Sequence, residues 1–139
     1  RVALLVRAPG ATAVGQSTEG IVELVDLYPT LADLCAIPIP PQTDGVSFAP
    51  LLKNPGQSWK KAAFTTIRRK LWSQPQSIRT ARYRYSEWGD PRHVELYDLR
   101  HDPREIHNLA TDPAYQEVRE QLHEQLHAGW DASLPDALR

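Results

Sequence analysis

The sequence predicts an α/β fold in two parts: one buried strand with a helix, followed by a small antiparallel sheet packed by a C-terminal helix. Val2–Val6 is apolar at every position, as strands covered on both faces of a sheet are. Between residues 62 and 99 apolar and polar residues alternate, which is the period of half-buried strands. A helical apolar stripe then runs from Tyr115 to Leu126. We place the boundary between the parts after residue 55.

In the first part, a loop of small residues over 8–20 follows the strand and leads to a helix. Asp26 is the expected N-cap, and Leu27, Leu31 and Leu34 are expected to form the buried stripe. Pro29 falls in the first turn, where a missing N–H costs little because those amides lack helical partners. Prolines at 38, 40 and 41 end the helix.

In the second part, the alternation predicts a sheet and one terminal helix. A two-residue hairpin at Ala81-Arg82 joins the middle strands, although such turns prefer Gly or Asn. Asp112 is the expected N-cap of the helix, with Pro113 at its first position. The predicted strands are Ala62–Arg68, Gln76–Thr80, Tyr83–Trp88 and Val94–Leu99.

Composition excludes several classes of protein. The 139 residues carry a formal net charge of −1, which does not favour binding to nucleic acid or to an anionic membrane. No apolar run reaches the ~18 residues that suggest a membrane span. The single cysteine, Cys35, excludes an internal disulfide, and its apolar flanks predict a packed core thiol. The first residue is Arg1 rather than Met, so we expect an internal or processed start.

Several segments of the sequence, taken in order, resemble known landmarks. Val94–Ala110 runs from a strand through an acidic turn at Asp102-Pro103 to an Asn-Leu-Ala segment. This pattern resembles the carboxy-terminal signature of sulfatases of the alkaline-phosphatase superfamily. The segments that resemble the iduronate-2-sulfatase-like subgroup are Arg1–Gly10, Val22–Leu34, Asp44–Leu52 and Ser77–Trp88.

The resemblance implies an α/β fragment, the C-terminal part of an alkaline-phosphatase-like sulfatase. Residues 1–55 would end the large α/β domain, and residues 56–139 would form the smaller C-terminal α+β subdomain. Implied partners are the rest of the sulfatase polypeptide and a sulfated carbohydrate substrate, with no nucleic acid and no membrane span. The implied compartment is periplasmic, secreted or lysosomal.

The chemistry that the family uses is not found in these residues. The family cleaves sulfate esters with a formylglycine made from a Cys/Ser-x-Pro-x-Arg motif, beside a Ca²⁺ held by Asp and Asn. In Cys35-Ala-Ile-Pro38 the proline comes one place late. We therefore expect no catalytic residue, no metal ligand and no cofactor bound by this chain, and no activity of the chain alone. Formylglycine and Ca²⁺ are implied for the full-length enzyme.

One segment matches a metal motif literally. His123-Glu-Gln-Leu-His127 is an H-E-x-x-H sequence on the predicted terminal helix, and in zinc proteases such histidines bind zinc while the Glu acts as base. Leu122 and Leu126 already define the buried face, and no third ligand follows in the sequence. The pattern therefore favours a solvated helix flank over a zinc hydrolase.

Basic residues concentrate on the predicted strands. Planar guanidinium groups suit sulfate and carboxylate oxygens. Because Ala63–Arg69 resembles a family segment that ends in Arg near the substrate cleft, Arg69 and its neighbour Arg68 are the substrate-binding candidates. The family usually has Ser-Gln in place of Thr65-Thr66. The alternative is an outward-facing set of strand residues, offset by Glu87, Asp90 and Glu95.

The aromatic and acidic residues each allow two interpretations. A stacking platform for a sugar or nucleobase competes with core packing under the helix, which alternation favours for Tyr83 and Tyr85. A calcium site competes with simpler turn and capping roles, which we favour. The aromatic set is Tyr83, Tyr85, Trp88 and Tyr97, and the acidic set is Asp98, Asp102 and Glu105.

The resemblance favours one function and leaves two alternatives open. The favoured function is membership of a sulfatase, iduronate-2-sulfatase-like, whose whole enzyme removes sulfate from sulfated carbohydrate. One alternative is a non-catalytic module that binds anionic glycans through its arginines. The other is a related enzyme of the family that acts on phosphonates or choline sulfate.

Overall fold

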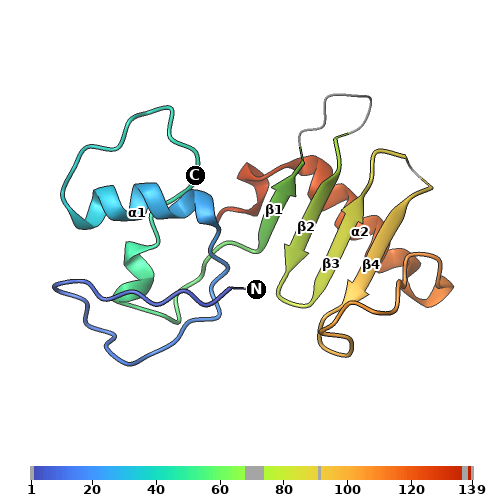
Figure 1. Ribbon diagram of the computed structural model, residues 1–139, viewed down its shortest axis with the longest axis horizontal. Coiled ribbons are helices and arrows are strands. Elements are labelled where there is room, and N and C mark those ends of the chain that lie inside the picture. Colours follow the sequence, from blue (N-terminus) through green and yellow to red (C-terminus); the bar gives the residue numbers. More distant parts are fainter. Residues whose placement is uncertain (1, 68–73, 91, 136–137, 139) are drawn as a thin grey trace. The chain divides into compact units, whose positions relative to one another are not determined.

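The computed structural model describes residues 2–67, 74–90, 92–135 and 138 (Figure 1). These residues form two compact units, and the division falls between Trp59 and Lys60. The sequence placed the boundary after residue 55. Within the described residues no helix is long and apolar enough to cross a membrane.

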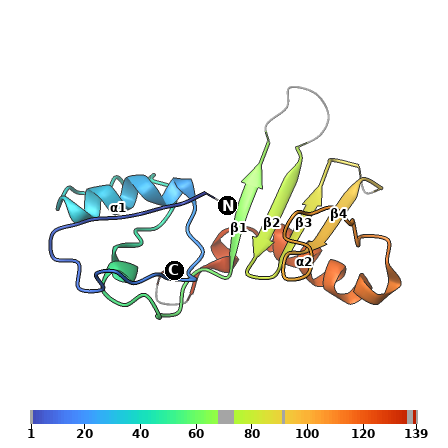
Figure 2. The ribbon, with the colours of Figure 1, turned by 60° about the horizontal axis from the view of Figure 1, so that its bottom comes forward.

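The first unit contains a single α-helix in its described residues, α1, which spans Leu27–Leu34. Two short 3₁₀ turns accompany it, at Leu24–Asp26 and Ala49–Leu52. The remaining chain of this unit is irregular (Figure 2). The predicted helix is therefore present, and it ends before the prolines at 38–41.

The strand predicted over Val2–Val6 is not formed. These residues adopt no regular structure, and Val2, Leu4, Leu5 and Val6 are 82%, 49%, 91% and 40% exposed. A strand that is buried on both faces needs neighbouring strands. The described residues of the first unit contain none, so an apolar composition alone did not produce a strand here.

The buried face of α1 also differs from the predicted leucine stripe. Leu31 is 61% exposed and Leu34 is 39% exposed, whereas the buried residues of the helix are Pro29, Thr30 and Ala32. The reason is a buried polar contact: the Thr30 hydroxyl donates to the carbonyl of residue 26 at 2.6 Å and accepts from the amide of residue 48 at 2.9 Å. Those bonds turn the threonine side of the helix inward.

Asp26 occupies the predicted N-cap position of α1, but its carboxylate does not cap that helix. The side chain is fully buried. Its oxygens accept from the amide of Glu23 at 2.8 Å and from the amide of Val46 at 3.0 Å. Gly45 precedes Val46 with φ +86°, and a Cβ there would lie 2.4 Å from the carbonyl oxygen of Val25. Asp26 thus joins the start of the helix to a distant loop that requires glycine.

The second unit contains a four-stranded antiparallel sheet in which each strand pairs with the next along the chain. The four strands agree with the predicted ones to within two residues at each end. They are β1 (Ala62–Thr66), β2 (Gln76–Thr80), β3 (Tyr83–Glu87) and β4 (Val94–Asp98) (Figure 1).

The hairpin between β2 and β3 turns at Ala81-Arg82, as predicted, without a glycine or asparagine. Ala81 and Arg82 keep negative φ, so this is not the turn that requires left-handed residues. Thr80 supplies the missing interactions: its hydroxyl accepts from the amides of Arg82 and Tyr83 at 3.3 and 2.9 Å. A threonine side chain therefore closes the turn.

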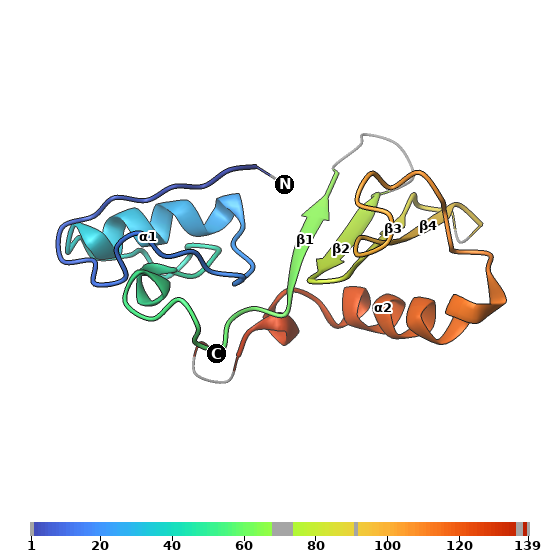
Figure 3. The same ribbon diagram turned by 90° about the horizontal axis from the view of Figure 1, so that it is seen from below.

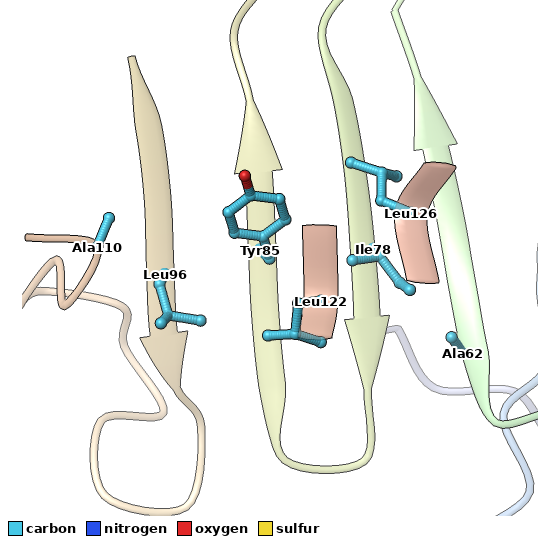
Figure 4. Packing of buried hydrophobic residues seen from close by; sticks show 7 residues of the cluster. All are labelled: Ala62, Ile78, Tyr85, Leu96, Ala110, Leu122 and Leu126. Atoms are coloured by element: carbon cyan, nitrogen blue, oxygen red, sulfur yellow. The ribbon is translucent and has the colours of Figure 1, made fainter. Parts of the chain in front are cut away.

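The terminal helix α2, Gln116–Ala128, covers one face of this sheet (Figure 3). A 3₁₀ turn, Pro113–Tyr115, precedes it, and Asp112 caps that turn by accepting from the amide of Ala114 at 2.9 Å. The predicted cap and apolar stripe are therefore confirmed. The core between sheet and helix consists of Ala62, Ile78, Tyr85, Leu96, Ala110, Leu122 and Leu126 (Figure 4).

Candidate functional site

The face of the sheet opposite α2 presents polar and charged side chains. Register places Arg79 directly opposite Arg84, and Arg84 directly opposite Tyr97. Since side chains alternate along a strand, all three point away from the helix-covered face. A groove of about 260 Å³ lies on this face. We call it the open-face groove, and its lining includes Ala63, Thr65, Ser77, Arg79, Arg84 and Trp88.

The charges of the two arginines are partly balanced within the fold. Arg84 lies 2.7 Å from Glu105 and 3.8 Å from Glu95, and Arg79 lies 3.6 Å from Glu105. The Arg84 guanidinium also stacks over the Tyr97 ring at 5.1 Å. Its buried Nε has no acceptor among the described residues. The groove is thus polar, and ion pairs with acidic side chains hold its two arginines.

The predicted substrate residues Arg68 and Arg69 lie outside the described residues. The residues on either side of that segment do line the open-face groove: Ile67 and Pro75 both contribute to it. The amide of Ile67 donates to the carbonyl of Pro75 at 2.9 Å. The assignment of Arg68 and Arg69 to a substrate site therefore stays a prediction.

The aromatic residues separate into two sets. Tyr85 is 3% exposed and belongs to the core under α2, with Tyr83 packed against that core. This confirms the core interpretation for both. Tyr97 is buried on the opposite face beneath Arg84. Trp88 is 41% exposed and lines the open-face groove, so it is the aromatic side chain available to a sugar ring.

The acidic turn after β4 has the structural role that the sequence favoured. Asp98 is 1% exposed and accepts from the Arg82 guanidinium through both carboxylate oxygens, the shortest distance being 2.7 Å. That pairing, with a contact to His101, keeps the pKa of Asp98 well below its usual range despite burial. Asp102 accepts from the amides of residues 106 and 107 at 2.7 and 2.8 Å. These carboxylates stabilise the turn.

The H-E-x-x-H segment is arranged in a way that the sequence did not reveal. His123 and His127 are exposed on the flank of α2, as predicted, but both face Glu87 on β3. Nδ1 of His123 lies 2.7 Å from Glu87 Oε1, and Nε2 of His127 lies 3.1 Å from Glu87 Oε2. The two imidazole rings are 4.4 Å apart between centroids. Alternation alone could have placed Glu87 on the helix side of β3, because Tyr85 is two residues before it.

Glu87 is held in this position by several groups. Burial alone would raise its pKa, but hydrogen bonds with His123, Tyr85 and His127 outweigh burial and lower that pKa. The Tyr85 hydroxyl donates to Glu87 at 2.9 Å. Burial, followed by this bond, raises the pKa of Tyr85. The carboxylate is therefore ionised at neutral pH and oriented toward the histidines. We call this set, Glu87, His123 and His127, the imidazole–carboxylate cluster.

Cys35 does not lie in a core, contrary to the prediction. It is exposed, at the C-terminal end of α1, because the buried side of that helix is formed by Thr30 and Ala32. Its sequence context still lacks the Cys-x-Pro-x-Arg spacing. Among the described residues, the one set of metal-ligating side chains that converges is the imidazole–carboxylate cluster. Ca²⁺ prefers six to eight oxygen ligands, so these residues do not fit the calcium of the family.

Comparison with known proteins decides the family. The family model described as "N-sulphoglucosamine sulphohydrolase, C-terminal" matches residues 1–131. The chain belongs to this sulfatase family. This confirms the sulfatase family that the order of the sequence landmarks predicted. The members of this family are sulfuric ester hydrolases.

Two curated relatives of the sulfatase chain come from Bacteroides thetaiotaomicron. An N-acetylglucosamine-6-O-sulfatase is 27% identical over 134 residues, which cover 88% of this chain and 23% of that protein. A delta 4,5-hexuronate-2-O-sulfatase is 34% identical over 100 residues, which cover 68% of this chain and 20% of that protein. The sulfatase chain therefore spans less than a quarter of the length of either relative.

A solved structure supports the same relationship. A 2-O glycosaminoglycan sulfatase is 30% identical and superimposes with a TM-score of 0.65 over 74% of this chain and 23% of the solved one. The fold class predicted from the sequence, an α/β fragment of an alkaline-phosphatase-like sulfatase, is confirmed.

Proposed function

We propose that the chain is part of an enzyme that removes sulfate from sulfated carbohydrate. We propose further that this enzyme is iduronate-2-sulfatase-like and that its substrate is a 2-O-sulfated uronate. Two similar proteins, a hexuronate-2-O-sulfatase and a 2-O glycosaminoglycan sulfatase, support this position of the sulfate. The 6-O-sulfatase among the relatives is 27% identical over 88% of this chain, whereas the hexuronate-2-O-sulfatase is 34% identical over 68% of it. The whole enzyme would cleave a sulfate ester, and this chain would supply one side of the substrate cleft.

The open-face groove is the observation that carries the proposed role of this chain. It combines the exposed Trp88 ring with the guanidinium groups of Arg79 and Arg84. A sugar ring stacks on an aromatic face, and guanidinium groups donate paired hydrogen bonds to sulfate or carboxylate oxygens. Arg68 and Arg69 directly follow Ile67, which lines this groove. We assign substrate contact to Arg69 first and to Arg68 second.

The nucleophile and metal of the reaction would come from the rest of the polypeptide. In the intact enzyme, a formylglycine residue would supply the attacking oxygen and a Ca²⁺ ion would polarise the sulfate. Cys35 lacks the motif for the former, and the described residues lack the oxygen-rich ligand set for the latter. The role of this chain is therefore to bind and orient substrate, and we expect the isolated chain to hydrolyse no sulfate ester.

The surface of the first unit supports the rest of the sulfatase polypeptide as a partner. Most of its large apolar side chains are exposed, including Leu5 at 91%, Leu24 at 76% and Leu31 at 61%. Exposed apolar surface on this scale marks a contact with other protein. We propose that this surface, Val2–Val6 included, packs against the rest of the large α/β domain. A periplasmic, secreted or lysosomal location is part of the same proposal, and fractionation of cells tests it.

The experiment compares substrates and variants in the intact enzyme. We expect faster sulfate release from a 2-O-sulfated hexuronate disaccharide than from glucosamine-6-sulfate. Arg69→Ala is expected to raise KM for the preferred substrate, with Lys70→Ala as the matched neighbouring control. A preference for the 6-O-sulfate would overturn the assigned position. A preference for choline sulfate would overturn the carbohydrate substrate, and a preference for a phosphonate ester would overturn the proposed sulfatase activity.

The alternative is a non-catalytic module that binds anionic glycans. The exposed Trp88 in a groove with two arginines favours it, but the ion pairs of those arginines with Glu105 and Glu95 reduce the net positive charge. Heparin binding distinguishes the two functions. Salt-sensitive binding by the isolated chain that is lost in Trp88→Ala would support the module. Absent or salt-independent binding would exclude it.

A further inference from the structure

The imidazole–carboxylate cluster has no role in the proposed function, and its geometry resembles that of a metal site. We propose that Glu87, His123 and His127 bind one divalent transition-metal ion, Zn²⁺ in the first place. In the sequence, no third ligand follows the H-E-x-x-H segment. The fold supplies a third donor from β3, 36 residues upstream of His123.

The donor atoms are close enough to share one ion. One ligand atom from each residue lies within 4.8 Å of the other two. A tetrahedral zinc ion with bonds of ~2.0–2.1 Å holds its ligand atoms roughly 3.3 Å apart. The two histidine–carboxylate distances are 2.7 and 3.1 Å. Small side-chain rotations would therefore bring the three donor atoms to distances that suit one ion.

The surroundings of Glu87 also suit a metal ligand. A ligating carboxylate is usually fixed by a hydrogen bond from a second residue, which orients it toward the ion. The Tyr85 hydroxyl provides this bond at 2.9 Å and is anchored in the core. The Tyr85 ring also meets the His123 ring edge-on, with 6.5 Å between centroids. These two contacts of Tyr85 hold Glu87 and His123 in place before an ion binds.

The ligand types select the kind of ion. Two imidazoles and one carboxylate suit Zn²⁺, Cu²⁺ or Ni²⁺, whereas Ca²⁺ and Mg²⁺ prefer oxygen ligands. The histidine side chains are 55% and 52% exposed, so water can complete the coordination. Glu124, the base that the zinc-protease motif would require, is exposed and lies outside the cluster. The ion would therefore link α2 to the end of β3 rather than serve as a protease centre.

Zinc binding by the purified protein tests this inference. Titration with ZnCl₂ against a chromophoric chelator is expected to reveal one tight site that depends on the cluster, and Co²⁺ in its place is expected to give the visible absorption of a tetrahedral ion. Glu87→Gln, His123→Gln and His127→Gln should each weaken zinc binding roughly tenfold or more. Glu124→Gln and His107→Gln are the matched controls and should retain the affinity of the unaltered chain. Circular dichroism verifies that each variant is folded.

Thermal unfolding gives a second readout. Zn²⁺ should raise the Tm of the unaltered chain and of Glu124→Gln, because an ion that binds the folded state stabilises it. At the same zinc concentration it should raise the Tm of His127→Gln much less, because the weakened site is less occupied. The inference is overturned if no such site titrates, if Glu87→Gln binds zinc as tightly as the unaltered chain, or if Glu124→Gln loses as much affinity as Glu87→Gln.

Discussion

The Asn108 side chain bonds to the amide of Leu96, with 3.0 Å between Oδ1 and the backbone nitrogen. The same oxygen accepts from the amide of Ala110 at 3.0 Å, and Nδ2 donates to the carbonyl of Val94 at 3.1 Å. The carboxamide thus pairs with strand β4 as a further strand would. This explains the Asn-Leu-Ala segment of the sequence signature, because a side chain satisfies the outer edge of the sheet and blunts it against pairing with other chains.

Replacing Asn108 with alanine is expected to destabilise the second unit. The amide of the fully buried Leu96 would lose its acceptor, which costs about 1–3 kcal/mol when the group stays buried. Urea unfolding followed by circular dichroism measures the loss. Asn108→Asp keeps the acceptor for the Leu96 amide but sets its second carboxylate oxygen against the carbonyl of Val94, so it should recover only part of the loss. Equal stability of Asn108→Ala and the unaltered chain would contradict this role.

The ion pair of the buried Asp98 with Arg82 is expected to make the stability of the chain depend on pH. Its pKa in the folded chain is lowered by Arg82, compared with about 3.9 for an unfolded aspartate. The stabilisation is therefore complete above about pH 4 and is lost as the pH falls through the folded pKa. Asp98→Asn should reduce the free energy of unfolding by about 2 kcal/mol at neutral pH, and the difference should shrink in acid. Exposed Asp131→Asn is the control, and a pH-independent difference would contradict the prediction.

The sequence predicted the second unit well because its determinants are local. Alternation set the faces of β1 to β4, and Asp112-Pro113 set the start of the terminal helical segment. The hairpin at Ala81-Arg82 was also placed correctly, although its closing contact from Thr80 could not be read from turn preferences.

Non-local contacts account for what the sequence did not predict. The hydroxyl of Thr30 accepts a hydrogen bond from the amide of Phe48, 18 residues further along the chain. This contact turns the threonine side of α1 inward, so Leu31 and Cys35 are exposed. The meeting of Glu87 with His123 depends on how α2 crosses the sheet, which spacing along the chain does not encode. Val2–Val6 has the composition of a strand but no neighbouring strand in the described residues, so composition alone was insufficient.

Leu122 is expected to be the most sensitive position tested on α2. It is 4% exposed and packs in the core between helix and sheet. Leu122→Ala should lower the free energy of unfolding by about 2–5 kcal/mol, because it removes buried apolar atoms and leaves a cavity in their place. Exposed Gln125→Ala on the same helix should change stability by less than about 0.5 kcal/mol. Denaturant midpoints of the two variants measure the contrast, and similar midpoints would mean that α2 does not anchor the second unit.

Gly45→Ala is expected to disrupt the first unit. A Cβ would stand 2.4 Å from the Val25 carbonyl oxygen and 3.1 Å from the Asp26 amide, at a φ of +86°. The clash involves backbone atoms, so relief requires moving the loop that bonds to Asp26. The conformation alone costs an alanine roughly 1–2 kcal/mol, and the clash adds to it. Gly56→Ala is the control, since its nearest neighbour lies at 3.8 Å. Loss of helical circular dichroism in Gly45→Ala alone would agree with this account.

Val2–Val6 tests the proposed packing against the rest of the sulfatase. In the isolated chain its apolar side chains are exposed and its backbone forms no regular structure, so its amides should exchange with solvent as fast as those of an unfolded peptide. In the intact enzyme the same amides should be strongly protected, because a strand buried on both faces bonds to neighbours on each side. Hydrogen exchange with mass spectrometry compares the two forms, and residues 11–16, which form neither helix nor strand in this chain, provide the internal reference. Fast exchange of Val2–Val6 in the intact enzyme would mean that its apolar run serves another purpose than joining the large sheet.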